Sequence, residues 1–275
     1  MTAKPVSGTK EWADGSGNLR ECEHLCPHEC HYCYARIKKP SEYVEPGLKI
    51  TGVKNPNRIM FPTQHDITPQ NIDRVLVALP EMLEQADNLL IVTKPHFECV
   101  EALCEFFYDY ALNGPGPKPC STLEALRYMQ ERVMFRFTIG SLDNEVLSFW
   151  EPGAPSYEER VASLILAHSR DFQTSVSCEP ALNLPLEYPR LVETLGPWVT
   201  DAIWIGRMNN VHQRLTANGA PEDMVSKGLW LEGQWLAPAV MELYELLKDN
   251  PLVKWKDSIK EILCLDRPTT PGADR

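Results

Sequence analysis

Short apolar runs rich in β-branched and aromatic residues alternate with stretches of helical periodicity through most of the chain. Strands that alternate with helices form parallel, right-handed βα units. We expect strands at residues 58–61, 89–93, 133–139, 172–177 and 202–206, and an earlier one at residues 19–23. We therefore predict an α/β fold, a partial (βα)6 TIM-type barrel, because six units are too few for a full eight-stranded barrel.

The chain divides into four expected segments. Residues 1–17 and 266–275 lack a periodic apolar pattern, so we expect a flexible N-terminus and a flexible tail there. The barrel domain is expected over residues 18–209. Residues 210–265 are expected to supply a lid over the site and then a C-terminal helical extension.

The composition is that of a compact globular protein, with 43% hydrophobic and 24% charged residues. A net charge of −11 argues against nucleic-acid binding through bulk electrostatics and leaves only local contacts with nucleic acid open. No run approaches the ~18–20 apolar residues of a membrane helix, and the start of the sequence has no apolar signal core. We expect a cytoplasmic protein without a membrane partner.

The cysteines are unevenly spaced, and four of the nine, Cys22, Cys26, Cys30 and Cys33, lie close together in the sequence. An odd total without a secretion signal argues against a disulfide framework and favours a metal site. The last three have the spacing C-x3-C-x2-C, with Tyr32 directly before the final cysteine. Three thiolates so close together suit a [4Fe–4S] cluster, which usually takes four. One iron would then be open to a substrate or cofactor.

This segment resembles the motif of the radical S-adenosylmethionine superfamily, which has the same spacing and an aromatic residue before the third cysteine. The resemblance implies a [4Fe–4S] cluster on Cys26, Cys30 and Cys33 whose open iron binds S-adenosylmethionine. It further implies reductive cleavage to a 5′-deoxyadenosyl radical, which abstracts a hydrogen atom from a substrate that the sequence does not identify. This chemistry also needs an electron donor such as a flavodoxin or ferredoxin.

Two other interpretations of the cysteine cluster stay open. A zinc-binding interaction module could use the four cysteines, with His24, His28 and His31 as substitutes, although zinc sites more often use two separated ligand pairs. An electron-transfer protein would use Cys22 as a fourth thiolate, which would close the open iron. We expect instead that Cys22 lies near the end of the first strand and does not bind the cluster.

Later motifs resemble the branch of the superfamily that contains spore photoproduct lyase and its uncharacterised relatives. The resemblance covers about residues 18–209 and makes a nucleic-acid repair or modification enzyme a further alternative. For Glu151 and Arg160 we expect an ion pair that fixes the loop after the fourth strand. The matching segments are Phe61-Pro-Thr-Gln-His-Asp66, Ile91-Val-Thr-Lys94, Phe137-Thr-Ile-Gly-Ser141, Glu151-Pro-Gly-Ala-Pro-Ser156 and Ser175-Val-Ser-Cys-Glu-Pro180.

Polar side chains of these motifs follow the strands, and in parallel barrels the C-terminal ends of the strands carry the site. Lys94 is expected to pair with the carboxylate of S-adenosylmethionine. Hydroxyl groups of the later strands are expected to hydrogen-bond the ribose or the carboxylate, and these belong to Thr138, Ser141 and Ser177.

Three further side chains are expected to bind the cofactor. Tyr32 would flank the adenine, Asp66 would take part in binding, and Glu179 would accept hydrogen bonds from ribose hydroxyls or a substrate amine. Glu179 and Cys178 are the candidate catalytic residues. Because side chains alternate along a strand, these two face opposite ways. Cys178 is then a packed core thiol, or, if the register is slipped by one residue, a hydrogen-atom donor.

Overall fold

A sheet of eight strands forms the centre of the computed structural model, which describes residues 4–23, 25–36, 44–115 and 121–274. The strand order is β2-β1-β3-β4-β5-β6-β7-β8, and all neighbours pair in parallel except β1 and β2. The predicted α/β class is confirmed. The bounds are β1 Gly15–Leu19, β2 Leu48–Gly52, β3 Arg58–Phe61, β4 Asn88–Thr93, β5 Val133–Thr138, β6 Gln173–Ala181, β7 Ile203–Arg207 and β8 Val253–Trp255.

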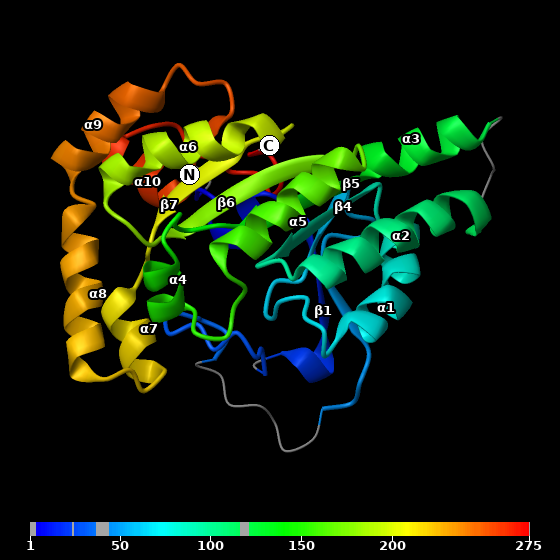
Figure 1. Ribbon diagram of the computed structural model, residues 1–275, viewed down its shortest axis with the longest axis horizontal. Coiled ribbons are helices and arrows are strands. Elements are labelled where there is room, and N and C mark those ends of the chain that lie inside the picture. The colour runs from blue at the N-terminus through cyan, green and yellow to red at the C-terminus, as the bar shows by residue number, and fades with distance from the viewer. Residues whose placement is uncertain (1–3, 24, 37–43, 116–120, 275) are drawn as a thin grey trace.

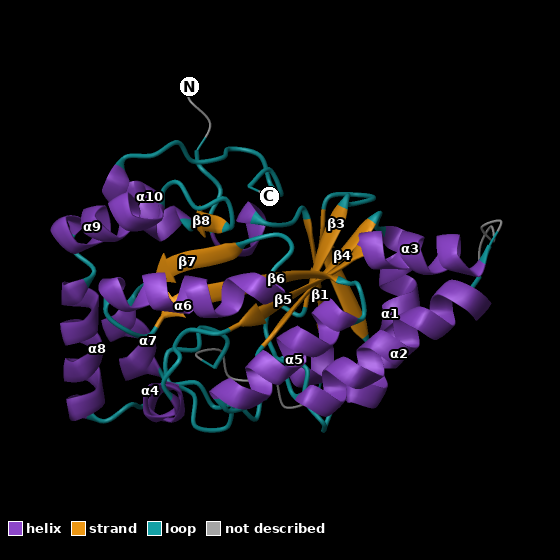
Figure 2. Cartoon of the chain, turned by 45° about the horizontal axis from the view of Figure 1, so that its top comes forward, coloured by secondary structure: helices purple, strands orange, loops and turns teal. Residues whose placement is uncertain are grey.

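Helices pack against the sheet and extend beyond both ends of it (Figures 1 and 2). Their bounds are α1 Ile72–Gln85, α2 Phe97–Asn113, α3 Thr122–Arg132, α4 Asn144–Trp150, α5 Tyr157–Ser169, α6 Tyr188–Leu195, α7 Val211–Ala217, α8 Glu222–Gln234, α9 Ala237–Leu247 and α10 Asp257–Leu263. Figure 1 shows α1, α2 and α3 at one end of the molecule and α7, α8 and α9 at the other. Among the described helices, none has the length and apolar character needed to cross a membrane.

The main hydrophobic core lies between the sheet and its covering helices. The rings of Phe107 on α2, Phe135 on β5 and Phe172 contact one another there, with centroids 5.3–6.2 Å apart. Val176 and Cys178 of β6 also point into this core. Because side chains alternate along a strand, Ser175, Ser177 and Glu179 of β6 point to the opposite face of the sheet, which we call the inner face.

The N-terminal segment covers part of the inner face. Trp12 is 4% exposed, and its ring centroid lies 5.6 Å from that of Trp204 on β7. The guanidinium carbon of Arg136 on β5 lies 4.5 Å from the Trp12 ring, and the Lys256 ammonium lies 3.7 Å from it. Trp12 therefore covers part of this face by packing on the Trp204 ring and by cation–π contacts with Arg136 and Lys256.

The first strand was predicted at the wrong residues, and two other strands were not predicted. The strand expected at residues 19–23 is β1, Gly15–Leu19, and Arg20–Cys22 form a 3₁₀ turn instead. The edge strands β2 and β8 were not predicted. β2 has no buried residue to mark a core-facing side, and β8 is only three residues long, so neither has an apolar period to detect. The five other predicted runs correspond to β3, β4, β5, β6 and β7.

The ends of the chain differ from the flexible segments expected at residues 1–17 and 266–275. Residues 8–11 form a 3₁₀ helix and β1 begins at Gly15. The two ends lie side by side, and Val6 N–H donates to the Pro268 carbonyl at 2.8 Å. Asp274 N–H donates in the same way to the Glu11 carbonyl at 3.1 Å. This pairing joins distant segments, so local periodicity gives no sign of it.

Replacing Trp12 tests whether the N-terminal segment belongs to the folded core. We expect Trp12→Ala to lower the free energy of unfolding by about 3–5 kcal/mol in urea denaturation, because the inner face loses a buried indole. The control Trp230→Ala removes an indole that is 56% exposed and should change the free energy by less than about 1 kcal/mol. Equal, small effects of the two substitutions would contradict the packing of this segment.

Candidate functional site

A cavity of about 790 Å³ opens where β3, β4, β5, β6 and β7 end. The loop that follows β1 contributes Cys26, Cys30 and Cys33 to its lining, and the N-terminal segment contributes Lys4 to Lys10 and Trp12. Cys30 is buried, and the other two cysteines are partly buried. The three cysteines of the motif thus share one cavity at the C-terminal edge of the sheet, where parallel α/β folds carry their sites.

Hydrogen bonds from two distant loops hold the cysteine loop in place. Asn218, which follows α7, donates through its amide Nδ2 to the carbonyls of His31 at 2.8 Å and Cys33 at 2.9 Å. Gly153 N–H donates to the His28 carbonyl at 3.0 Å. A Cβ atom at residue 153 would lie only 2.1 Å from the carbonyl oxygen of Pro27, so this close approach needs glycine.

Asp66 joins the cysteine loop to the end of β4. Its Oδ1 accepts from the Lys94 backbone N–H at 2.9 Å and from the Thr93 hydroxyl at 3.0 Å. Its Oδ2 lies 3.0 Å from His28 Nδ1 and 3.4 Å from Lys94 Nζ. Burial raises the pKa of Asp66, but Lys94 and His28 outweigh burial and hold this pKa well below its usual value. Asp66 is therefore a carboxylate at neutral pH.

Lys94 stays charged beside the Asp66 carboxylate. Burial lowers the pKa of Lys94, and the Asp66 carboxylate outweighs this effect and raises the pKa well above the usual value. The Lys94 ammonium lies 5.9 Å from the centre of the Tyr32 ring. Because the Lys94 side chain is only 11% exposed, the cavity contains an ammonium group largely shielded from bulk water.

Buried hydrogen bonds through Glu151 and Arg160 hold the Tyr32 side chain in place. Its hydroxyl donates to Glu151 Oε1, and Arg160 Nη2 donates to Glu151 Oε2 at 2.6 Å. Arg160 also donates to the carbonyls of Pro155 at 2.9 Å and Thr138 at 3.2 Å. The predicted ion pair between Glu151 and Arg160 is confirmed, with both side chains 0% exposed. It ties the end of β5 to the loop that leads into α5.

Glu179, at the end of β6, is paired through a residue that the sequence analysis missed. Glu179 Oε2 lies 3.3 Å from Lys256 Nζ, which also lies 2.9 Å from Glu11 Oε1. Gly206 leaves the space for this contact, because a Cβ there would lie 2.8 Å from the Lys256 side chain. Lys256 is fully buried, so one ammonium links the N-terminal segment, β6 and the segment before α10.

Six of the predicted cofactor-binding residues line this cavity with the three cysteines. The six are Tyr32, Asp66, Lys94, Thr138, Ser177 and Glu179. Cys178 points into the main core on the other side of β6 and is 0% exposed, which agrees with the core alternative for this thiol. The partly buried Cys22 ends the turn after β1 and packs against the main core.

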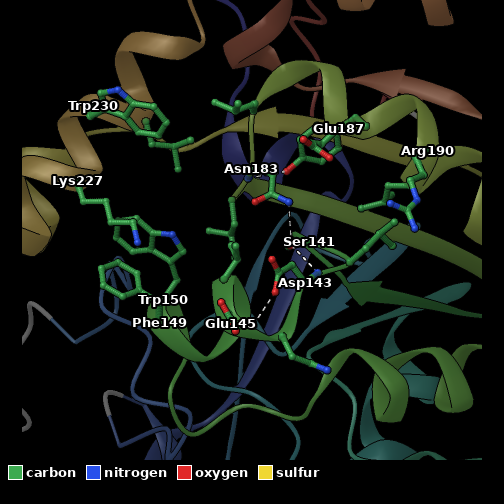
Figure 3. A pocket seen from close by; sticks show the side chains of 18 residues that line it. Ser141, Asp143, Glu145, Phe149, Trp150, Asn183, Glu187, Arg190, Lys227 and Trp230 are labelled. Carbon is green, nitrogen blue, oxygen red and sulfur yellow. Dashed lines mark hydrogen bonds between the residues drawn. The ribbon is translucent and has the colours of Figure 1, made fainter.

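Ser141 lies in a different place from the one predicted. It lines a second cavity, of about 830 Å³, formed by α4, α8 and the loop after β6 (Figure 3). Its hydroxyl accepts from Asp143 N–H at 2.9 Å and from Asn183 Nδ2 at 3.0 Å. The resemblance placed Ser141 in the site because it follows β5 closely, but β5 ends at Thr138 and the chain has turned toward α4 by Ser141.

Further contacts of the site were not predicted from the sequence. His28 Nε2 lies 2.9 Å from His96 Nε2, so the fully buried His28 bridges Asp66 and the start of α2. Asn18 Oδ1 accepts from the backbone N–H of Thr63 at 2.8 Å and so shapes the turn after β3. Each contact joins segments far apart in the chain, so spacing within one motif could not have found it.

No protein-family model and no curated protein matches the sequence. Among solved structures, SuiB of Streptococcus suis bound to the precursor peptide SuiA is similar, with 9% identity and a TM-score of 0.41 over 86% of this chain and 47% of that one. SuiB bound to S-adenosylmethionine is similar with 8% identity and a TM-score of 0.39 over 82% of this chain and 46% of that one. The chain thus spans about half the length of the structures it matches.

The buried Glu151 gives a stability effect that depends on pH. Burial raises its pKa, but Arg160 and Lys94 outweigh burial, so this pKa lies below the ordinary value of 4.5. A carboxyl whose pKa is lowered by folding stabilises the fold above its unfolded pKa, and this contribution is lost as the pH falls through the folded pKa. We expect Glu151→Gln to lower the free energy of unfolding by about 3–5 kcal/mol at pH 7.

Urea denaturation at several pH values measures this effect. The difference between wild type and Glu151→Gln should shrink below about pH 4.5 as the wild-type carboxyl takes up a proton. The control Glu242→Gln changes an exposed glutamate of α9 and should have little effect at any pH. A pH-independent difference for Glu151→Gln would contradict a charged Glu151 in the folded protein.

Proposed function

We propose that the protein is a radical S-adenosylmethionine enzyme that holds a [4Fe–4S] cluster on Cys26, Cys30 and Cys33. The observation that carries the proposal is the convergence of these three cysteines with Lys94 and Glu179 on one cavity. The cysteines come from one loop, whereas the other two residues come from the ends of β4 and β6. The convergence is therefore a property of the fold and not of the local motif.

The donor set fits such a cluster. Burial raises the pKa of the Cys26 thiol to about 12 and raises that of Cys30 as well, and the Lys94 charge only partly opposes this. Buried thiols of this kind ionise when they bind a metal, and thiolates are the ligands that iron–sulfur clusters take. Cys22 packs against the main core instead of the cavity, which supports a cluster with three protein thiolates.

Protein groups around the cluster site suit S-adenosylmethionine. When bound, the reduced cluster would supply the electron that cleaves S-adenosylmethionine to a 5′-deoxyadenosyl radical. The Lys94 ammonium would pair with the carboxylate of S-adenosylmethionine, and Asp66 would position that ammonium through their ion pair. Thr138 and Ser177 offer hydroxyls to the ribose or carboxylate.

Two other side chains would complete the cofactor site. The Tyr32 ring, held through its hydroxyl by Glu151, would flank the adenine. The Glu179 carboxylate, oriented by Lys256, would accept from the ribose hydroxyls or from a substrate amine, and it is the candidate catalytic residue. The electron would come from a separate donor of the flavodoxin or ferredoxin kind.

The proposal extends to the architecture and the branch of the family. The parallel strands β1 and β3 to β7 would form a partial (βα)6 barrel that begins at Gly15, three residues before the expected bounds of 18–209, with residues 210–265 as a lid and helical extension. The motifs at Lys94, Glu151 and Glu179 favour the branch that contains spore photoproduct lyase. The net charge of −11 disfavours a nucleic-acid substrate, so we propose a different substrate class below.

One group of side chains could also be considered as a zinc site. Cys26, His28 and Asp66 present ligand atoms that all lie within 4.8 Å of one another. Structural zinc sites are almost always four-coordinate, and this group offers three ligands, of which Asp66 is already engaged by Lys94. Of the other histidines considered as substitutes, His24 lies outside the described residues and His31 is partly buried.

Anaerobic reconstitution separates these functions. We expect wild-type protein to take up iron and sulfide and, after reduction with dithionite, to release 5′-deoxyadenosine from S-adenosylmethionine. Cys30→Ala should abolish the product, because two thiolates remain at the cluster site. The matched control Cys99→Ala changes a buried cysteine of α2 outside the cavity and should retain the product.

Cys22→Ala tests the four-thiolate alternative. We expect this variant to bind the cluster and to release 5′-deoxyadenosine as the wild type does, because Cys22 lies outside the cavity lining. Loss of the cluster in Cys22→Ala would favour an electron-transfer protein. Uptake of zinc without a cluster and without 5′-deoxyadenosine in the wild type would favour an interaction module.

A further inference from the structure

The cavity is basic, although the chain as a whole is acidic. The chain carries a net charge of −11, yet basic side chains outnumber acidic ones in the cavity lining. A concentration of one charge in a concave, partly shielded site raises the local concentration of ligands with the opposite charge. The basic residues are Lys4, Lys10, Arg36, Lys94, Arg207 and Arg214, and the acidic ones are Glu29, Asp66 and Glu179.

Two of the three acidic side chains already have an ammonium group of the protein beside them. Asp66 lies 3.4 Å from the Lys94 ammonium, and Glu179 lies 3.3 Å from the Lys256 ammonium. The third, Glu29, is an exposed residue of the cysteine loop. The excess positive charge is therefore carried by side chains other than Lys94.

Arg207 and Arg214 are partly buried members of this excess, supplied by β7 and the helix that follows it. Arg207 ends β7, and Arg214 lies in α7, which follows it. Neither guanidinium forms an ion pair with a carboxylate in the described part of the chain. The Nε atom of Arg207 is buried and has no hydrogen-bond partner among the described residues. Because Arg207 and Arg214 line the cavity and form no such ion pair, they are available to an anionic ligand that enters it.

Neither the cluster nor S-adenosylmethionine accounts for these two arginines. S-adenosylmethionine carries a sulfonium and an amino group against one carboxylate, and Lys94 already serves that carboxylate in the proposed site. Lys94 also lies beside the cysteine loop, with its ammonium 5.9 Å from the centre of the Tyr32 ring and 3.4 Å from Asp66 Oδ2. A second, anionic occupant is needed to balance Arg207 and Arg214.

We propose that the substrate is an anion, a carboxylate or a phosphate ester, held by Arg207 and Arg214 in the same cavity. Both anions match the planar, two-pronged donor geometry of a guanidinium. The location beside the cysteine loop brings the anion within the cavity where the radical would form, so this inference rests on the proposed function. Asn209 lies between the two arginines in sequence and also lines the cavity, where its amide offers a further donor.

Calorimetry with simple anions tests the site. Inorganic phosphate and succinate are titrated separately into reconstituted, unreduced protein at low ionic strength, with and without saturating S-adenosylmethionine. We expect at least one anion to bind saturably under both conditions. Its affinity should fall about tenfold or more in Arg207→Gln and in Arg214→Gln, since hydrogen bonds between charged groups are lost. Preference for phosphate or for succinate would identify the substrate as a phosphate ester or a carboxylate.

The control Arg190→Gln removes an exposed arginine of the second cavity and should leave anion binding unchanged (Figure 3). Thermal unfolding of each variant checks that it is folded, and Arg207→Lys, which keeps the charge but loses the planar fork, should bind with intermediate affinity. Absence of saturable binding by the wild type, or equal loss in Arg190→Gln, would overturn the inference.

Cleavage of S-adenosylmethionine by the same wild-type preparation distinguishes the two proposals. Cleavage without anion binding would overturn the anionic substrate and leave the radical chemistry in place. Anion binding that depends on Arg207 and Arg214, without cleavage, would overturn the proposed function and leave an anion site without radical chemistry.

Discussion

The ion pair between Asp66 and Lys94 is the contact on which the site depends. Two hydrogen bonds to Oδ1 fix the carboxylate on the end of β4, while Oδ2 faces His28 of the cysteine loop and the Lys94 ammonium. In a partly buried setting each charge needs the other, because an unpaired one would be strongly destabilising. The same pair therefore places the cysteine loop against the sheet and keeps a cation in the cavity.

A second buried cation joins the N-terminal segment to β6. The Lys256 ammonium pairs with both Glu11 and Glu179 and lies over the Trp12 ring. This arrangement makes the N-terminal segment part of the cavity lining, and it leaves Glu179 held in place beside the site. Arg207 and Arg214 line the same cavity and form no ion pair with a carboxylate in the described part of the chain, so they are its candidates for holding an anionic ligand.

The sequence predicted what short spacing and alternation can encode. Alternating apolar runs gave the α/β class and β3 to β7, and alternation along β6 separated Glu179 from Cys178. The pairing of Glu151 with Arg160 followed from one motif. Contacts between distant segments escaped prediction, as Trp12 on Trp204 and Lys256 on Glu179 show, because nothing in either local segment indicates its distant partner. Ser141 was misplaced because closeness to a strand in sequence does not fix the direction of the turn that follows.

Electron paramagnetic resonance of the reduced, reconstituted protein tests the central claim most directly. The claim is that Cys26, Cys30 and Cys33 hold a cluster whose remaining iron faces the cavity. The account predicts a [4Fe–4S]⁺ signal whose g values shift when S-adenosylmethionine is added, because the cofactor would bind the open iron. A [4Fe–4S]⁺ signal that S-adenosylmethionine leaves unchanged would contradict it, since a fourth protein ligand would then occupy that iron.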